Sequence, residues 1–69
     1  MESISITANG DVYTCDKDCS LINFLENKNQ NPQHVVIEVN HQALTPSECR
    51  EYKLANGDKL EIVRIVAGG

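Results

Sequence analysis

The chain has 69 residues, and its six lysine and arginine residues against ten aspartate and glutamate residues give a formal net charge of −4. A chain this short buries only about 60% of the surface that its unfolded form exposes, so we expect residues 1–69 to form a single domain with little room for an enclosed catalytic cleft. The basic residues are scattered, whereas nucleic-acid binding depends on a concentrated positive surface. The composition therefore disfavours nucleic acid and anionic membranes as partners and favours a basic protein surface.

The cysteine count and the first residues of the sequence indicate a reducing compartment. Cys15, Cys19 and Cys49 are an odd number, and a disulfide framework normally shows more cysteines in an even number. The sequence opens without the basic and apolar segments of a signal peptide, and no apolar run approaches the roughly 18 residues that suggest a membrane span. We expect a cytoplasmic protein with no membrane partner.

The first fourteen residues predict a β-hairpin. Polar and apolar residues alternate over residues 3–8, which is the period of a strand with one buried face. Asn9-Gly10 is the dipeptide best suited to the positive φ angles of a tight hairpin turn. Residues 11–14 are then the returning strand.

A helix follows a polar crossing over residues 15–19. Ser20 is the expected N-cap, because its hydroxyl can accept a hydrogen bond from an amide of the first turn. Leu21, Phe24 and Leu25 have the i, i+3, i+4 spacing of one helix face. The helix is predicted from Leu21 to residue 27 or 28, and the asparagine-rich segment before Pro32 ends it.

The middle of the chain contains the strongest strand pattern. In Val35–Val39 the first, third and fifth residues should point into the core, and Val36 and Glu38 should point away from it. A turn at Asn40-His41 and a short extended piece around residues 43–44 follow. Thr45-Pro46 then begins a short helix that is expected to carry Cys49 and Tyr52, with the proline at its first position.

The last predicted strand covers residues 59–63, after a turn at Asn56-Gly57-Asp58. Leu60 and Ile62 should face inward. Alternation breaks beyond this point, and the pattern leaves open which of the following apolar residues stay exposed. The order of hairpin, helix, strand, short element and strand predicts an α+β fold of the β-grasp (ubiquitin-like) type. We expect a mixed sheet of four to five strands, one main helix packed on a single face and a short second helix.

Most chemically reactive side chains have ordinary structural interpretations. The cysteines lack the paired spacings of a zinc site, so no metal site is expected, and Cys49 suits a small, partly buried hydrophobic position. Aspartates flank Cys15 and Cys19 and oppose a thiolate there. His34 and His41 lack a partner at a recognisable spacing. The carboxylates of the second half, at positions 48, 51, 58 and 61, are interpreted as a solvated acidic face.

The C-terminal sequence Val66-Ala67-Gly68-Gly69 is the strongest candidate for a functional site. Glycine has no Cβ, so such a tail can lie extended in a narrow channel and let a partner approach its carboxylate closely. An ATP-using partner would convert the carboxylate to an acyl adenylate, with pyrophosphate leaving, and a sulfur nucleophile would then displace AMP to give a thiocarboxylate. On this interpretation ATP and magnesium belong to the activating partner. The chain itself is a protein cosubstrate, with no catalytic residue and no bound cofactor.

The segment Leu54-Ala55-Asn56-Gly57-Asp58-Lys59-Leu60-Glu61-Ile62-Val63, with its fixed distance to Gly69, resembles the ThiS family of sulfur carriers of thiamin (thiazole) biosynthesis. The resemblance covers nearly the whole chain and includes the early hairpin and the apolar face of the helix. It implies a β-grasp fold, adenylation of Gly69 by a ThiF-type enzyme and sulfur transfer to a ThiG-type thiazole synthase. Only Gly68 and Gly69 match the functional motif residue by residue.

The directions in which strand side chains point predict an apolar docking patch beside the tail, formed by Val36, Val63 and Ile65. We expect the chain to be a monomer when it is free of partners. The sequence departs from the family at Asn40-His41, where Asn-Gly is common, and at Ser47, where a basic residue is common. Three alternatives remain open: a MoaD-like small subunit of molybdopterin synthase, a sulfur carrier that serves tRNA thiolation or cysteine synthesis, and a ubiquitin-like modifier or docking module.

Overall fold

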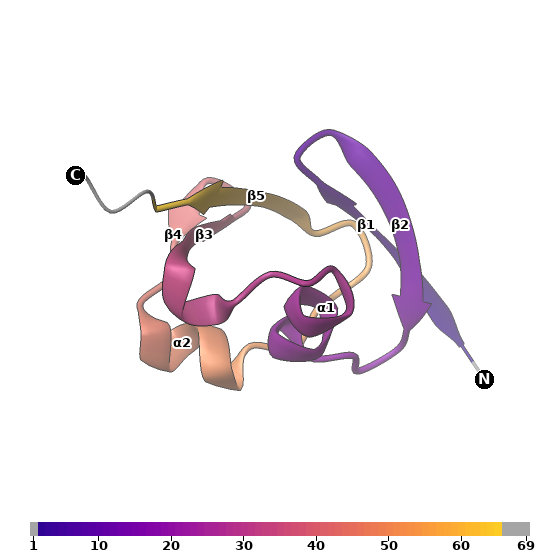
Figure 1. Cartoon of the computed structure of the whole chain (residues 1–69). Coiled ribbons are helices and arrows are strands. Elements are labelled where there is room, and N and C mark those ends of the chain that lie inside the picture. The colour runs from indigo at the N-terminus through magenta and orange to yellow at the C-terminus, as the bar shows by residue number, and fades with distance from the viewer. Residues whose placement is uncertain (1, 66–69) are drawn as a thin grey trace.

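The computed structural model of the chain describes residues 2–65, and five strands and three short helices account for most of them (Figure 1). The strands are β1 (Ser3–Ala8), β2 (Asp11–Asp16), β3 (Val35–Val39), β4 (Gln42–Ala43) and β5 (Lys59–Arg64), and the helices are α1 (Leu21–Asn27), the 3₁₀ helix η1 (Pro32–His34) and α2 (Pro46–Glu51). Their order confirms the predicted α+β architecture.

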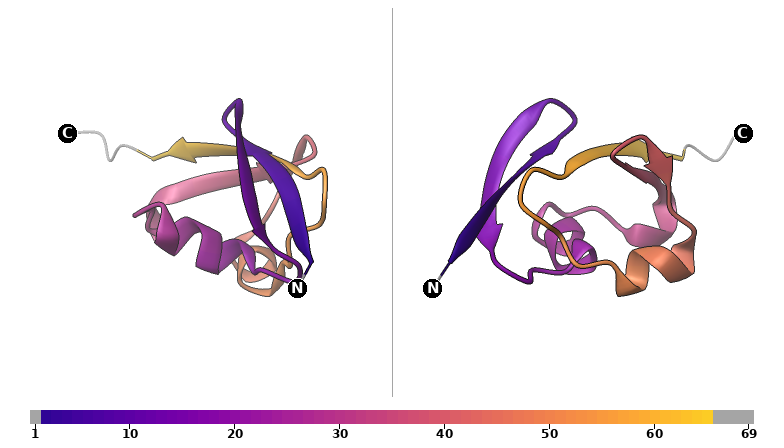
Figure 2. Two further views of the ribbon diagram at one scale, coloured as in Figure 1. Left: turned by 90° about the vertical axis from the view of Figure 1, so that its right-hand side faces the viewer. Right: turned by 180° about the vertical axis from the view of Figure 1, so that it is seen from behind.

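The strands form one mixed sheet in the order β2-β1-β5-β3-β4. The last strand of the chain, β5, is therefore the central one: it runs parallel to β1 and antiparallel to β3. Antiparallel hairpins form the two sides of the sheet, β1 with β2 and β3 with β4. The helices α1 and α2 lie on the same side of the sheet, which leaves its other face open (Figures 1 and 2).

The hydrophobic core lies between the sheet and α1, and it confirms the predicted facing of the strands. Alternate residues of β3, namely Val35, Ile37 and Val39, are buried, as are Ile4, Ile6 and Ala8 of β1. They pack with the three apolar residues of the α1 face, Leu21, Phe24 and Leu25. Ser20 is the N-cap of α1, and its hydroxyl oxygen accepts the Asn23 N–H at 3.0 Å.

The structure differs from the sequence-based expectation at the ends of several elements. Strand β2 continues to Asp16, so Cys15 belongs to the strand and not to the crossing. The short helix η1 was not predicted. Tyr52 is the C-cap residue that follows α2, because its backbone is extended, at φ −77° and ψ 130°. Ile62 lies on the inward face of β5, but it is half-buried, whereas Leu60 is fully buried.

Both hairpins use two-residue turns in the left-handed region. Asn9 and Gly10 have φ angles of 50° and 88°, and Asn40 and His41 have φ angles of 52° and 69°. These are the positive angles that a type I′ turn requires, and they match the right-handed twist of the strands on either side. His41 occupies the position where glycine is favoured, and a side chain with a Cβ is strained there.

Asp58 is buried, and the prediction that it belongs to a solvated acidic face is wrong. The residue is only 6% exposed. One carboxylate oxygen accepts the Tyr52 hydroxyl at 2.8 Å and the Ala55 N–H at 2.9 Å, and the other accepts the Asn40 side-chain amide at 3.1 Å. Burial and the hydrogen bond to Asp58 raise the pKa of the Tyr52 hydroxyl. Three donors, two from the segment between α2 and β5 and one from the β3–β4 turn, therefore meet on one buried carboxylate.

We predict that Asp58→Ala costs about 3 kcal/mol of unfolding free energy, because it leaves several partly buried donors without an acceptor. Tyr52→Phe removes only one of these hydrogen bonds and should cost about 1–2 kcal/mol. Urea unfolding followed by circular dichroism measures both values. The matched control is Glu26→Ala, since this carboxylate is exposed on α1 and should change stability by no more than about 0.5 kcal/mol. Equal losses for Asp58→Ala and Glu26→Ala would contradict the structural role of Asp58.

Candidate functional site

Strand β5 carries the chain from the centre of the sheet to its C-terminal segment. Its register with β3 pairs Val36 with Val63 and Val35 with Arg64. One residue further, the Ile65 N–H donates to the His34 carbonyl oxygen at 2.8 Å, so the sheet hydrogen bonds continue to the last described residue. The candidate residues Gly68 and Gly69 lie outside the described residues, and they begin three positions beyond this anchor.

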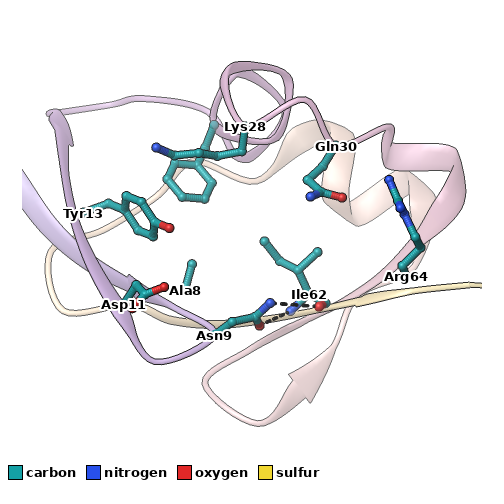
Figure 3. Close-up of a pocket in the computed structure, with 9 residues that line it drawn as sticks. Ala8, Asn9, Asp11, Tyr13, Lys28, Gln30, Ile62 and Arg64 are labelled. Carbon is teal, nitrogen blue, oxygen red and sulfur yellow. Dashed lines mark hydrogen bonds between the residues drawn. The ribbon is translucent and has the colours of Figure 1, made fainter.

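The opposite edge of β5 is held by the side chain of Asn9. Strand β1 pairs with β5 only through Thr7 and Ala8. Beyond them, the Asn9 Oδ1 accepts the Ile62 N–H at 2.8 Å, and its Nδ2 donates to the Ile62 carbonyl oxygen at 3.1 Å (Figure 3). One amide side chain thus replaces a pair of strand hydrogen bonds, because it both donates and accepts.

The sequence predicts Asn9 only as a turn residue, and its contact with β5 was missed. The signal that could have found it is the choice of asparagine over aspartate at the first position of the turn, since a carboxylate cannot donate to a carbonyl oxygen. This signal is weak, because asparagine is also a preferred residue of the turn itself.

Val36, Val63 and Ile65 lie on the open face of the sheet. They are 43%, 59% and 54% exposed, respectively. Val36 and Val63 are direct cross-strand partners, and Ile65 follows two residues after Val63. Because side chains on one face of a strand recur every second residue, the three positions share one face close to the start of the C-terminal segment. Their role as a docking patch remains a prediction.

An acidic pair lies beside this patch. Glu38 and Glu61 are cross-strand partners on the same open face, two residues after Val36 along β3 and two residues before Val63 along β5. Like charges directly opposite each other across strands are destabilising. The open face of the sheet therefore presents an apolar pair and an acidic pair in adjacent positions.

A groove of about 610 Å³ adjoins the patch between β3, η1 and α2. Val36 and Ile65 line it, together with apolar side chains that include Pro32, Leu44 and Pro46. Arg50 is the charged residue of its lining. The groove extends the apolar surface around the C-terminal end of β5 toward α2.

A second cavity, of about 440 Å³, lies on the helix side of β5 between the β1–β2 hairpin and α1 (Figure 3). Its lining carries charges of both signs, from Asp11, Lys28 and Arg64. The Lys28 Nζ lies 4.1 Å from the centroid of the Tyr13 ring, so this ammonium group already makes a cation–π contact. Mixed charge and an engaged lysine do not define a ligand class for this cavity.

The remaining sequence candidates have structural roles. Cys49 is 7% exposed in α2, which confirms its expected hydrophobic position, and burial raises the pKa of its thiol. Glu48 completes a capping box at the start of α2: its carboxylate accepts the Thr45 N–H, and its own N–H donates to the Thr45 hydroxyl. Across residues 2–65 the structure brings no three histidine, cysteine or carboxylate side chains together as metal ligands. None of the helices in this part of the chain has the length and apolar character to cross a membrane.

The fold and the position of β5 define a ubiquitin-like β-grasp protein whose central strand leads to the C-terminus. The ThiS family model matches residues 6–69, and the chain belongs to the ThiS family of sulfur carrier proteins. The crystal structure of the thiamine biosynthesis protein ThiS from Geobacter metallireducens superimposes with a TM-score of 0.77 at 23% identity, covering 96% of this chain and 100% of that one. This likeness supports the β-grasp fold.

Two curated relatives are also similar over nearly their whole length. The ycf40 protein of Pyropia yezoensis, which is described as uncharacterized, is 36% identical over 67 residues, which are 97% of this chain and 94% of the relative. The ycf40 protein of Porphyra purpurea, with the same description, is 32% identical over 68 residues, which are 99% of this chain and 96% of the relative.

We predict that Asn9→Gly loosens the C-terminal half of β5. Glycine retains the positive φ of the turn but removes both side-chain hydrogen bonds to Ile62, at a cost of about 1–2 kcal/mol. Hydrogen exchange of the Ile62 amide, measured by NMR, should become about 5–30-fold faster. The control is Gly10→Asn, which changes the same turn and leaves the Asn9 side chain in place. An Ile62 amide that stays fully protected in Asn9→Gly would rule out the clamp.

Proposed function

We propose that the terminal carboxylate of Gly69 is the group that carries sulfur in this protein. The observation that carries the proposal is the anchoring of β5 by Asn9 at Ile62 on one edge and by His34 at Ile65 on the other, the latter only four residues before the C-terminal carboxylate. A four-residue segment reaches at most about 14 Å. Any enzyme that modifies Gly69 therefore has to bind close to the end of β5, next to the exposed patch of Val36, Val63 and Ile65.

The chemistry follows from the weak electrophilicity of a carboxylate. A ThiF-type partner with ATP and magnesium would transfer AMP to the Gly69 carboxylate, with pyrophosphate leaving. A sulfur nucleophile would then attack the acyl carbon and displace AMP, which leaves a C-terminal thiocarboxylate. The protein would take part as a cosubstrate, since ATP, magnesium and the catalytic side chains belong to the partner.

The proposed sulfur acceptor is a ThiG-type thiazole synthase that builds the thiazole part of thiamin. Support comes from membership of the ThiS family and from the similarity to the thiamine biosynthesis protein of Geobacter metallireducens. The molybdopterin and modifier alternatives differ from this proposal in the acceptor of the activated C-terminus. Mass spectrometry of the C-terminal peptide also separates a sulfur carrier from a modifier.

The open face of the sheet suggests the kind of surface that the activating partner presents. The pair Val36–Val63 and the neighbouring Ile65 offer apolar contact area, and the pair Glu38–Glu61 offers negative charge beside it. A partner with apolar side chains flanked by lysine or arginine would bury the first and neutralise the second. Such charge complementarity mainly increases the association rate and the specificity of docking.

We predict that protein isolated from cells with an intact sulfur pathway contains a form in which one C-terminal oxygen is replaced by sulfur. Mass spectrometry of the C-terminal peptide detects this replacement, and alkylation of the cysteines beforehand distinguishes it from a persulfide. Deletion of Gly69 should lower sulfur transfer by about 10²-fold or more, because the reacting carbon is displaced by a whole residue. Conjugates through lysine side chains, or sulfur transfer that survives the deletion, would refute the proposal.

We further predict that Val63→Asp weakens activation by the partner enzyme by about tenfold or more, because it places a charge in the centre of the apolar patch. Pyrophosphate release at limiting carrier concentration measures this effect. The matched control is Val12→Asp, since Val12 is 70% exposed on β2, away from the patch. Glu61→Lys should slow association most strongly at low salt. Equal effects of Val63→Asp and Val12→Asp would remove this face as the docking surface.

A further inference from the structure

Cys15 and Cys19 lie on the two sides of the turn that joins β2 to α1. Cys15 is the penultimate residue of β2, and Cys19 directly precedes the N-cap of α1. The Cys19 N–H donates to the Asp16 carbonyl oxygen at 3.0 Å, and Asp18 has a φ of 70°. These are the features of a β-turn with a left-handed third residue, which reverses the chain within four residues. The turn therefore brings Cys19 back to the end of the strand that carries Cys15.

The two thiols share one environment. Both side chains are half-buried and pack against the hydrophobic core, and Cys15 lies on the same side of β2 as Tyr13, whose ring contacts Phe24 of α1. Burial raises the pKa of the Cys15 thiol, and the neighbouring Cys19 thiol raises it further. All three cysteines are present as free thiols. The β-turn thus brings two free thiols to the same junction between β2 and α1, where both pack against the core.

The backbone on the helix side of this pair is held independently of the thiols. The Cys19 carbonyl oxygen accepts the Leu54 N–H at 2.9 Å, and the Leu21 N–H donates to the Tyr52 carbonyl oxygen at 3.0 Å. Cys19 is therefore fixed from the side of the 52–54 segment. A bond between the two sulfur atoms would remove the hydrogen bond that the Cys19 thiol donates to the Ser20 carbonyl oxygen at 3.5 Å, and it would leave these backbone hydrogen bonds in place.

We propose that Cys15 and Cys19 form a reversible dithiol–disulfide site, with a low-molecular-weight disulfide such as glutathione disulfide as the oxidant. The Cys19 thiolate attacks one sulfur of the oxidant and displaces one thiolate, which forms a mixed disulfide. The Cys15 thiolate then attacks the Cys19 sulfur and displaces the second thiolate. The protein loses two protons and two electrons, and the oxidant is reduced to two thiols.

The site is separate from the proposed sulfur-carrying terminus. The β2–α1 junction and the C-terminal end of β5 lie at opposite ends of the molecule in the views of Figures 1 and 2. Cys49 does not take part, because it is buried in α2. Oxidation of the pair should therefore leave activation of Gly69 possible, and a failure of either proposal leaves the other standing.

The test is equilibration of the full-length protein with excess glutathione disulfide, followed by acid quenching, alkylation with N-ethylmaleimide under denaturing conditions and mass spectrometry. We expect a protein that has lost two hydrogen atoms, carries one alkyl group on Cys49 and yields a peptide with Cys15 and Cys19 cross-linked. Dithiothreitol should restore three alkylation sites. Stable glutathione adducts on both cysteines, unreacted thiols at both, or disulfide-linked dimers would overturn the proposal.

Two variants make the result specific. In Cys15→Ser the second step is removed, so the mixed disulfide with glutathione should accumulate on Cys19. The native sequence should retain less than about a tenth of that adduct, because a neighbouring thiol acts at high effective concentration. Cys49→Ser is the matched control and should form the cross-link to the same extent as the native sequence. An adduct on Cys19 that is equally abundant with and without Cys15 would show that the thiols do not meet.

Discussion

The buried carboxylate of Asp58 is the interaction on which the position of β5 depends. It lies directly before the strand and accepts hydrogen bonds from Tyr52, Ala55 and Asn40. Asn40 also accepts the Lys59 N–H through its side-chain oxygen, so the β3–β4 turn and the first residue of β5 are tied to the same point. A carboxylate with several donors is stable at low exposure because these hydrogen bonds replace the ones that it loses to water. Removing this carboxylate would release the segment between α2 and β5, the β3–β4 turn and the start of β5 together.

From this fixed start, β5 is held as far as Ile62 on its β1 edge and as far as Ile65, one residue past its end, on its β3 edge. Asn9 substitutes for a strand on one side through its two bonds to Ile62, and His34 accepts the last amide, that of Ile65, on the other side. A short protein with little core can in this way present its C-terminus from a defined place. For a carrier whose reactive group is the terminal carboxylate, a fixed origin reduces the orientational entropy that a partner enzyme has to overcome.

Local patterns were enough to predict most of the fold and part of the candidate site. Alternation in Val35–Val39 gave the inward and outward faces of β3, and the exposure of Val36 follows from the same period of two. The roles of Asp58 and Asn9 were missed, because their partners are determined by tertiary contacts: Asn9 and Ile62 are 53 residues apart in sequence. The position of Cys15 in β2, across the turn from Cys19, was likewise not predicted, because β2 extends two residues further than the hairpin pattern indicates. Residues that act through distant backbone groups leave almost no trace in hydrophobic periodicity.

Two features of the open face of the sheet favour the docking of a partner. Glu38 and Glu61 face each other across two central strands in a chain that already has a net charge of −4, and this arrangement lowers the stability of the sheet. The adjacent pair, Val36 and Val63, leaves apolar side-chain surface exposed to water, which is also unfavourable. Both costs disappear when a partner covers the face with apolar contacts and a cationic side chain. The end of β5 beside this face is where the four-residue C-terminal segment begins, so a partner bound there would be in reach of Gly69.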